Sequence, residues 1–471
     1  TFTLKELDWN DRQAGDDNTN PFPSFTGNTI NDVFLFKNRL GFLSGENIIF
    51  SEAGEYFNFF RTTTAALLDS SPIDITASTN KVSKLHSAVP YNERLIIFSD
   101  QTQFVLDAEP YLSVKTVTLS PSNEIESLST VKPVVSSNAI YYGFSRTGYS
   151  GVGELGVSVE DADQMEVNDA TAHVPKYIKG NIKKIVTATN EDVICCITDD
   201  LTSATLYVFK YHNNAQNQKV QAAWFKYSFG TTNDFISDIS FIGNKLYMII
   251  RRSGNMYLES LTFEDDLKDT NMDYEVCLDH RYDKPANNSG VSYGASTTIT
   301  LPTGYVVTSS MKLVTEDSVQ YSTSTWGSNT FTVAANLTDA GNFFIGIPYT
   351  MEYSFSQPFL KHERVTDTGR YQIQRAFLEY ANARSFTVDV VHNPKMDAPN
   401  KTTITNTYAN DALHSILTGS ADLQEGFFKF GVQERNDRLG ITVKNDTPYP
   451  SDFLSIDYEA RTFSRGSRWR G

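Results

Sequence analysis

The C-terminal end of the chain, residues 461–471, carries four arginines and no acidic residue. The whole sequence has a formal net charge of −16, so this basic tail is a sharp local reversal of charge. Guanidinium groups bind carboxylates and phosphates, and an interleaved indole ring adds contact area. We therefore predict a contact with an acidic subunit or with the DNA backbone, favouring the subunit, and the alternative is a solvated tail. The candidate contact residues are Arg461, Arg465, Arg468, Trp469 and Arg470.

One glycine motif has the letters of a dinucleotide fingerprint. Residues Gly151 to Gly156 read GVGELG and match G-x-G-x-x-G. A dinucleotide site needs a helix that begins within the motif, so that its N-terminus meets the pyrophosphate. The residues that follow, Val157-Ser158-Val159, alternate as a strand does. We predict a loop between strands here and no cofactor.

An acidic turn near the start resembles the beginning of a calcium loop. Asp16, Asn18 and Asn20 have the right spacing, but Pro21 replaces the required glycine. Position twelve of the loop is Gly27, where a bidentate glutamate belongs. We predict a cluster of turns at this position.

Other catalytic and metal-binding patterns are missing from the sequence. The seven histidines are scattered, no H-E-x-x-H or G-x-S-x-G motif occurs, and the cysteines include no C-x-x-C pair. His173, near Pro175, is expected to make a structural hydrogen bond. We expect no catalytic, cofactor-binding or metal-binding residues. A glycosidase needs two carboxyls at a set distance, and the sequence identifies no such pair.

The chain contains three cysteines, which are Cys195, Cys196 and Cys277. The first two lie within the apolar run 193–197, where neighbouring residues of a strand point to opposite faces of the sheet. We predict packed thiols, not a disulfide between them. The odd number in so long a chain indicates synthesis in a reducing compartment.

Charge and hydropathy limit the possible partners. The chain has 56 acidic and 40 basic residues, which argues against a protein that grips nucleic acid through a broad basic surface. No run approaches the roughly 18 apolar residues of a membrane helix, so we expect no membrane span. The sequence begins at Thr1 without an initiator Met or a signal peptide, so we expect a processed chain or a piece of a longer one.

A repeated pattern indicates the fold. Apolar runs flank a polar corner, and the first apolar residue after the corner falls at 40, 95, 140, 193 and 246. The spacings are therefore 55, 45, 53 and 53 residues. A period of about 50 residues with short β-branched and aromatic runs is typical of four-stranded propeller blades. We predict a mainly β fold with a β-propeller-like array. At least one further blade is expected outside this set, either upstream or closed by distant strands. An evenly spaced β-sandwich is the alternative.

The change of pattern along the chain predicts the domains. A lead-in at 1–25 continues from a missing N-terminal region, and the propeller-like domain takes 26–265. A linker follows at 266–290, and one or more C-terminal β domains take 291–471, ending in the basic tail. Within the last part, strands are predicted at 296–301, 305–313, 330–335, 386–391 and 441–444. Short helices are predicted at 160–168, 359–364 and 411–417.

Several longer sequence segments resemble the tail tubular protein B family, the nozzle proteins of short-tailed phages of the autographivirus type. The longest are NDVF at 31–34, NRLGFLS at 38–44, SEAGEYFNFF at 51–60 and FSDQTQFVL at 98–106. Shorter ones are RQAGD at 12–16, NPFPSF at 20–25, PID at 72–74, HVPKYI at 173–178, IPY at 347–349 and ND at 445–446. The resemblance covers most of the chain and is densest over residues 10–110.

The resemblance implies a structural protein of the virion tail that is assembled in the host cytoplasm and is not an enzyme. It implies a homo-hexamer below an adaptor ring of tail tubular protein A, near the tail fibre. Such a nozzle is a conduit and gate through which genomic double-stranded DNA leaves, and an acidic lumen would repel that DNA. Family members are considerably longer than this chain. Two other functions stay open, a propeller enzyme that degrades polysaccharide and a propeller that binds carbohydrate or protein.

Overall fold

The computed structural model divides the chain into two compact units, Thr1–Glu264 and Asp265–Gly471, each described by itself. It describes residues 3, 5–78, 82–157, 165–214, 219–230, 233–264, 267–284, 289–362, 365–367, 369–396, 401–410 and 423–462.

The first unit contains five antiparallel sheets that follow one another along the chain. Within each sheet, consecutive strands pair as a meander, and β13 also pairs with β11. A single turn of 3-10 helix, η1 (Thr189–Glu191), precedes β15. The strands of the first two sheets are β1 (Asp32–Phe36), β2 (Arg39–Ser44), β3 (Asn47–Phe50), β4 (Ile73–Thr76), β5 (Leu85–Tyr91), β6 (Arg94–Ser99), β7 (Gln103–Ala108) and β8 (Val117–Asn123). The strands of the last three are β9 (Val134–Ser136), β10 (Ala139–Arg146), β11 (Tyr149–Val157), β12 (Met165–Asp169), β13 (Ile178–Lys179), β14 (Ile182–Ala188), β15 (Val193–Thr198), β16 (Ala204–Asn213), β17 (Lys219–Phe229), β18 (Phe235–Ile242), β19 (Lys245–Arg252) and β20 (Asn255–Thr262).

The polar corners of the repeat are the turns between the first and second strands of each sheet. Lys37 and Asn38 have φ of 43° and 61°, and Asn92 and Glu93 have 47° and 64°. Two successive positive φ values are typical of the two-residue hairpin turn whose twist matches that of its strands. The apolar run after each corner is the second strand, β2, β6, β10, β15 or β19. The prediction of a mainly β fold of four-stranded propeller-like units is confirmed.

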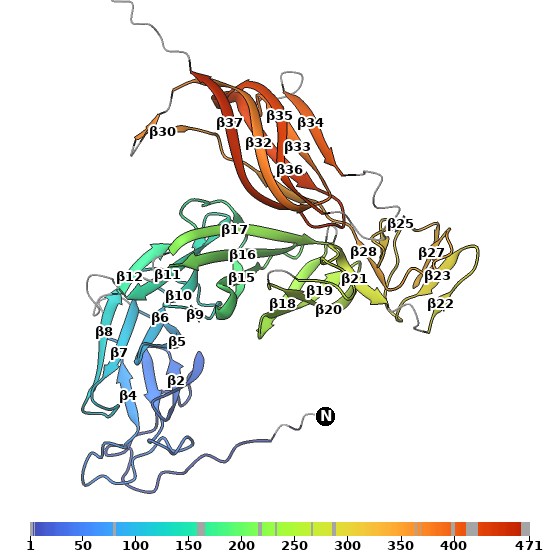
Figure 1. Ribbon diagram of the computed structural model, residues 1–471. Coiled ribbons are helices and arrows are strands. Elements are labelled where there is room, and N and C mark those ends of the chain that lie inside the picture. Colours follow the sequence, from blue (N-terminus) through green and yellow to red (C-terminus); the bar gives the residue numbers. More distant parts are fainter. Residues whose placement is uncertain are drawn as a thin grey trace, which may run out of the picture. The chain divides into compact units, whose positions relative to one another are not determined.

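Consecutive sheets pack face to face and follow an arc, from blue at β1 to yellow-green at β20 (Figure 1). Four buried clusters each join two neighbouring sheets, because side chains alternate between the two faces of a strand. Cys195 packs with the residues of β18 and β19, whereas Cys196 packs with those of β10 and β11. Both thiols are buried and free, so the prediction of packed cysteines is confirmed.

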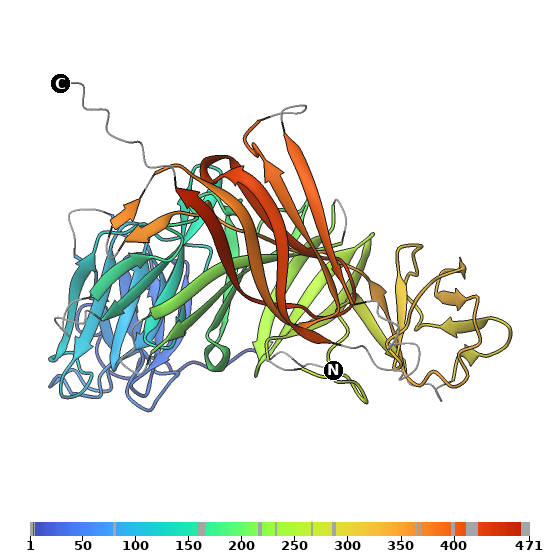
Figure 2. The same cartoon turned by 45° about the horizontal axis from the view of Figure 1, so that its top comes forward.

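The second unit contains two β-sandwiches, each with its own core. The first has the sheets β21-β28-β24-β25 and β22-β23-β27-β26, which enclose side chains such as Leu313, Phe331 and Phe343. Its strands, yellow to light orange in Figure 2, are mostly short. They are β21 (Asp279–Lys284), β22 (Val291–Ser292), β23 (Thr297–Thr300), β24 (Lys312–Thr315), β25 (Gln320–Ser322), β26 (Thr325–Trp326), β27 (Thr330–Val333) and β28 (Phe343–Ile347).

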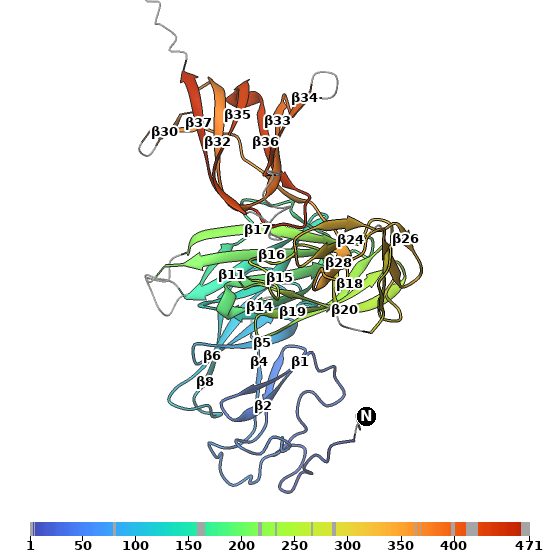
Figure 3. The same cartoon turned by 45° about the vertical axis from the view of Figure 1, so that its right-hand side comes forward.

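The other sandwich is made of the long strands at the C-terminal end. Figure 3 shows its two layers, β29-β36-β33-β34 and β35-β32-β37, facing each other. A hairpin, β30 with β31, and one turn of 3-10 helix, η2 (Asn436–Arg438), complete it. Its strands are β29 (Met351–Ser354), β30 (Leu360–His362), β31 (Val365–Asp367), β32 (Tyr371–Ala383), β33 (Ser385–His392), β34 (Thr402–Ala409), β35 (Gln424–Arg435), β36 (Leu439–Asn445) and β37 (Asp452–Thr462).

Most of the strands predicted in the second unit are present, and one is wrong over most of its length. The predicted strands at 296–301, 330–335, 386–391 and 441–444 correspond to β23, β27, β33 and β36. The prediction at 305–313 fails because regular strand begins only at Lys312. Tyr305 and Met311 instead lie in turns, where their backbone N–H groups donate to the carbonyls of Pro302 and Thr308 respectively. Both side chains pack in the core of this sandwich.

The predicted short helices are also wrong where the structure describes them. Residues 165–168 belong to β12, and 360–362 belong to β30. Both are edge positions where charged side chains are tolerated, so the polar composition misled the prediction. The helix predicted at 411–417 lies outside the described residues.

The glycine motif 151–156 lies within β11 and not in the predicted loop. A Cβ at Gly151 would come within 2.3 Å of the Phe144 ring, and one at Gly153 within 2.2 Å of the Tyr142 ring. These glycines make room for aromatic rings of the neighbouring strand β10. The whole motif is strand, so no helix begins within it as a phosphate site requires, and its glycines have a packing role.

The burial of the thiols yields a testable prediction. Burial raises the pKa of Cys195, Cys196 and Cys277, which lowers the fraction of reactive thiolate in each. Only Cys277 is partly exposed. We expect native protein treated with maleimide near pH 7.5 to take up one label per chain, at Cys277, as located by peptide mass spectrometry. A Cys277→Ser variant should then take up none until it is unfolded, and native labelling of Cys195 or Cys196 would contradict the packing.

Candidate assembly surface

Among the described residues of the first unit, irregular chain and not another sheet covers the outer face of the first sheet. Its cover is made by the lead-in, residues 5–31, and by the long connection between β3 and β4, residues 51–72, here called the 51–72 loop. Phe25 and Phe59 pack on Phe42 and Ile49 of the sheet. Figure 3 shows both segments as irregular chain beyond β2. This cover lies where the resemblance to the nozzle family is densest.

A buried arginine holds the 51–72 loop in place. Arg39, the first residue of β2, is 1% exposed. Its guanidinium donates to five backbone carbonyls at 2.7–3.2 Å, those of Ser51, Asp69, Ser70, Ser71 and Leu112. Burial lowers the pKa of Arg39, and the nearby Glu52 carboxylate opposes that effect. An arginine side chain stays protonated even when it is buried. The positive charge of Arg39 is therefore stabilised mainly by the dipoles of these carbonyls.

The start of the same loop is fixed by a second set of contacts around Glu52. The Glu52 carboxylate accepts hydrogen bonds from the Asn58 amide at 2.6 Å and from the Ser70 hydroxyl at 3.3 Å. The Asn38 side chain accepts from the Tyr56 hydroxyl at 2.8 Å. The residues of 51–60, which carry part of the family resemblance, therefore order their own loop. The Glu52 carboxylate is engaged in hydrogen bonds within this loop, and these contacts do not indicate an active site.

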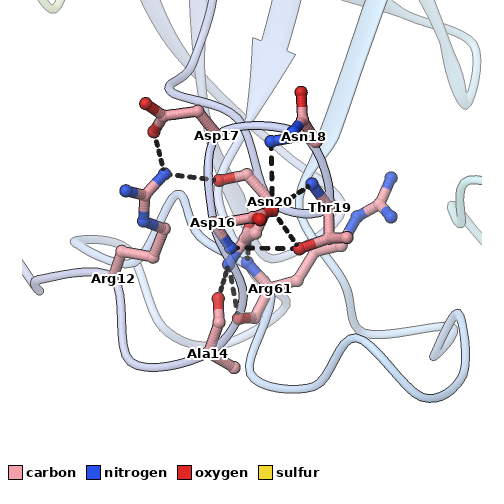
Figure 4. Close-up of polar contacts among 8 residues, drawn as sticks. All are labelled: Arg12, Ala14, Asp16, Asp17, Asn18, Thr19, Asn20 and Arg61. Atoms are coloured by element: carbon pink, nitrogen blue, oxygen red, sulfur yellow. Dashed lines mark hydrogen bonds and ion pairs between the residues drawn. The ribbon is translucent and has the colours of Figure 1, made fainter.

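The lead-in is fastened to the loop through Asn20, which is 3% exposed (Figure 4). The Asn20 amide donates to the carbonyls of Ala14 at 2.8 Å and Arg61 at 3.0 Å, and it accepts from the Arg61 backbone at 3.0 Å. Arg12 donates to the Asn20 carbonyl at 3.1 Å and to the Asp17 carboxylate at 2.5 Å. These hydrogen bonds fix the position of the turn at residues 16–20 over the first sheet.

The calcium-like turn satisfies its own carboxylate. One oxygen of Asp16 accepts from the backbone of Asn18 and from the backbone and hydroxyl of Thr19, at 2.8–3.1 Å (Figure 4). These hydrogen bonds lower the pKa of Asp16. The geometry is that of an Asx-turn, as the turn-cluster prediction requires. Nowhere in the described ranges do three or more His, Cys, Asp or Glu side chains come together as a possible metal site.

The outer surface of this cover is aromatic. Trp9 contacts Phe57 in an edge-on arrangement with ring centroids 5.5 Å apart, and Phe22 contacts Phe60 in the same way at 5.5 Å. The Arg12 guanidinium lies 5.0 Å from the centre of the Phe22 ring. Four of the aromatic side chains remain substantially exposed: Trp9 at 48%, Phe22 at 56%, Tyr56 at 40% and Phe57 at 40%. We call these four the aromatic surface. Rings of this kind are enriched at protein interfaces.

The basic tail predicted from the sequence is described only at its start. Arg461 is exposed near the end of β37, opposite Gln372 of β32. Arg465, Arg468, Trp469 and Arg470 lie outside the described residues, so the contact prediction stays a prediction. His173 is exposed on a turn.

Sequence reasoning missed the roles of Arg39 and Asn20. The sequence contains no signal for the burial of Arg39, because its acceptors lie between 12 and 73 residues away along the chain. None of the helices in the described part of the chain has the length and apolar character needed to cross a membrane.

The arginine network yields a prediction with an internal control. Arg39→Met should leave the carbonyls around the guanidinium unsatisfied and weaken the loop by about 2 kcal/mol or more. Amide hydrogen exchange across the 51–72 loop should then accelerate by at least about 30-fold, since 1.4 kcal/mol is a factor of ten. Arg94 occupies the same position in the second sheet, at the start of β6, but is partly exposed and pairs with Asp107 at 3.2 Å.

Arg94→Met is therefore the matched control. Loss of a partly exposed pair of this kind costs about 1 kcal/mol or less. Exchange of the 51–72 loop should remain at the wild-type rate in this variant. Equal acceleration in both variants would show that Arg39 does not organise the loop.

Comparisons with known proteins agree with the resemblance. The sequence model of the family described as "Bacteriophage nozzle protein" matches residues 1–469. The chain is 28% identical over 484 residues to "Tail tubular protein gp12" of Escherichia phage T7, and the match covers 99% of this chain. The chain spans 60% of the length of that curated relative.

The solved structures that match this chain are remote from it. Hsv2 of Kluyveromyces lactis is 11% identical with a TM-score of 0.32, over 50% of this chain and 62% of Hsv2. The Pan2 WD40 domain of Neurospora crassa is 8% identical with a TM-score of 0.30, over 69% of this chain and 90% of that domain. Scores this low carry no argument about fold or function. The family match, in contrast, extends over nearly the whole sequence. The chain therefore belongs to the bacteriophage nozzle protein family and is a structural component of a phage virion tail.

Proposed function

We propose that this chain is one subunit of a homo-hexameric nozzle that conducts and gates DNA during ejection, below an adaptor ring of tail tubular protein A. In this proposal the nozzle also helps to attach the tail fibres, and the protein is not an enzyme. The observation that carries the proposal is the family match over residues 1–469, together with a relative named as a tail tubular protein.

The geometry supports a role in assembly. A ring held by heterologous contacts needs two different, complementary patches on each subunit. The aromatic surface is a suitable first patch because its backbone is fixed by Arg39 and Asn20, so little conformational entropy is lost on binding. The net charge of −16 is consistent with DNA passing through without being held.

The polysaccharide-degrading alternative needs a carboxyl that stays protonated near neutral pH. Glu275 is a described carboxyl whose pKa is raised, because of burial. It lies 3.9 Å from the Arg281 guanidinium, which is already paired with Asp269 and Asp283. A cation so close favours the ionised carboxylate and opposes the role of a general acid. No observation in the described structure favours this alternative. Release of reducing sugar when the protein is incubated with host surface polysaccharide would support the polysaccharide-degrading alternative.

The oligomeric state tests the ring directly. We expect the full-length protein to form particles of six subunits in mass photometry, and ring-shaped particles with a central opening in electron microscopy. A protein that remains monomeric at micromolar concentration, alone and with the adaptor protein, would contradict the proposal. A lumen lined mainly by Lys and Arg in the assembled ring would contradict the proposed repulsion of DNA.

The basic tail provides a second test. Replacing Arg461, Arg465, Arg468 and Arg470 by Gln should weaken assembly of the ring or its binding to the adaptor, because the tail loses the charge that would meet an acidic surface. A variant with Lys at the same four positions keeps the charge and is the matched control. We expect the Gln variant to lose most of the assembled fraction near 0.15 M salt and the Lys variant to keep most of it. Unchanged assembly of the Gln variant would show that the tail is solvated and does not contribute to these contacts.

A further inference from the structure

The first half of β17 is a strand with exposed side chains on both of its faces. The side chains at 220–223 are all exposed. The second half is better covered, since Trp224 packs on the Phe209 ring with centroids 4.9 Å apart and donates to the Ala170 carbonyl at 2.9 Å. A strand end with so little buried apolar surface is expected to open easily. The contacts of its first residue, Lys219, therefore decide how firmly this end is held.

A change of register directs the Lys219 side chain toward the third sheet. His212 and Asn213 are consecutive in β16, but their partners in β17 are Gln221 and Lys219. The residue in between is left out of the pairing, as in a β-bulge, and a bulge redirects the side chains beyond it. Simple alternation would place Lys219 on the face opposite to Trp224, but both side chains contact the same ring of β16.

The Lys219 ammonium lies among three aromatic rings from the third and fourth sheets, which are neighbours in the stack (Figure 1). Its Nζ is 5.6 Å from the centre of the Tyr141 ring of β10, and 5.3 Å and 5.2 Å from the centres of the Phe209 and Tyr211 rings of β16. It donates to the Glu154 carboxylate of β11 at 2.5 Å and to the Tyr141 hydroxyl at 3.3 Å. We call Tyr141, Glu154, Phe209 and Tyr211 the ammonium cage.

Contacts that do not involve the lysine hold the cage in shape. Tyr141, Phe209 and Tyr211 are 1–3% exposed, and their ring centroids are 5.7–6.3 Å apart. The Tyr211 hydroxyl forms a hydrogen bond with the Ser136 hydroxyl at 2.9 Å. Glu154 is directly opposite Tyr141 in the pairing of β10 with β11, so both side chains lie on one face. A site that is ordered before it is filled loses little conformational entropy on binding.

We propose that the ammonium cage is a recognition site for an alkylammonium cation, and that Lys219 fills it from within the chain to fasten the first half of β17 onto the third sheet. Several aromatic faces around one cation are the feature by which proteins recognise quaternary ammonium groups, and the carboxylate adds charge attraction. The ligand class of the emptied site is therefore a small quaternary ammonium ion. The proposal rests on this contact alone and does not depend on the nozzle function.

Removal of the lysine in the full-length protein tests the fastening. Lys219→Ala should accelerate amide hydrogen exchange across residues 220–223 at least about tenfold, because the strand end loses its contact with the third sheet. The matched control is Lys226→Ala, because Lys226 is exposed on the same strand and its ammonium lies 5.9 Å from the centre of the Tyr177 ring. Exchange across 220–223 should stay at the wild-type rate in the control. Unchanged exchange in Lys219→Ala would overturn the proposal.

A cation that is not attached to the chain tests recognition by the cage. Tetramethylammonium chloride should restore slow exchange across 220–223 in Lys219→Ala, because the ion enters the emptied cage. Sodium chloride and the neutral molecule tert-butanol, each at the same concentration, should not restore it. Lys219→Met keeps an apolar stem in the cage but carries no charge. This variant should exchange as fast as Lys219→Ala and should not respond to tetramethylammonium.

Each other result would count against the site. Slow exchange in Lys219→Met would show that apolar packing and not the charge holds the strand. Fast exchange in Lys219→Ala without recovery in tetramethylammonium would show a simple ion pair with Glu154. Equal recovery in sodium chloride or tert-butanol would show a solvent effect. Any of these results would overturn the proposal, and none depends on the number of subunits in the assembly.

Discussion

The structure of the first unit depends on one constraint, which is that its first four sheets bury apolar side chains on both faces. Residues next to each other in a strand point in opposite directions, so Cys195 and Cys196 of β15 belong to two different cores. A sheet of this kind cannot exist alone in water, and it must lie between two partners. The stack of five sheets follows directly, and so does the need for a cover on the outer face of the first sheet.

The cover of the first sheet shows how a buried charge can order an irregular segment. The 51–72 loop has few ladder hydrogen bonds, so its carbonyls need other donors. The guanidinium of Arg39 provides them to both ends of the loop and to Leu112, which lies in the connection between β7 and β8 of the second sheet. Desolvation of the cation is unfavourable, but five acceptors at hydrogen-bond distance offset it. The position of Arg39 at the start of β2 links the loop to the repeat itself.

The period of the repeat was predictable because it depends on local chemistry. Corners such as Lys37-Asn38 and Asn92-Glu93 combine turn-forming residues with flanking apolar runs, and they are hairpin turns in the structure. The role of Arg39 was not predictable, because its acceptors lie as far along the chain as Leu112. The glycines of 151–156 illustrate the same limit. Their letters suggest a loop, but the reason for Gly153 is the Tyr142 ring on the neighbouring strand, which only the register reveals.

Many of the residues that mark the chain as a nozzle protein are internal, whereas Phe22, Tyr56 and Phe57 are exposed. In the segment NRLGFLS, Arg39, Phe42 and Leu43 are buried, and Gly41 lies against the Phe34 ring. In the segment SEAGEYFNFF, Ser51 and Asn58 are buried and Glu52 bonds within its own loop. Such residues report the architecture of the first sheet and its cover, not the chemistry of a partner. In the assembly that we propose, partner contacts are made by exposed groups such as Trp9 and Phe22, which the internal residues hold in place. The family match therefore establishes the scaffold, and the specificity of assembly depends on the surfaces that this scaffold presents.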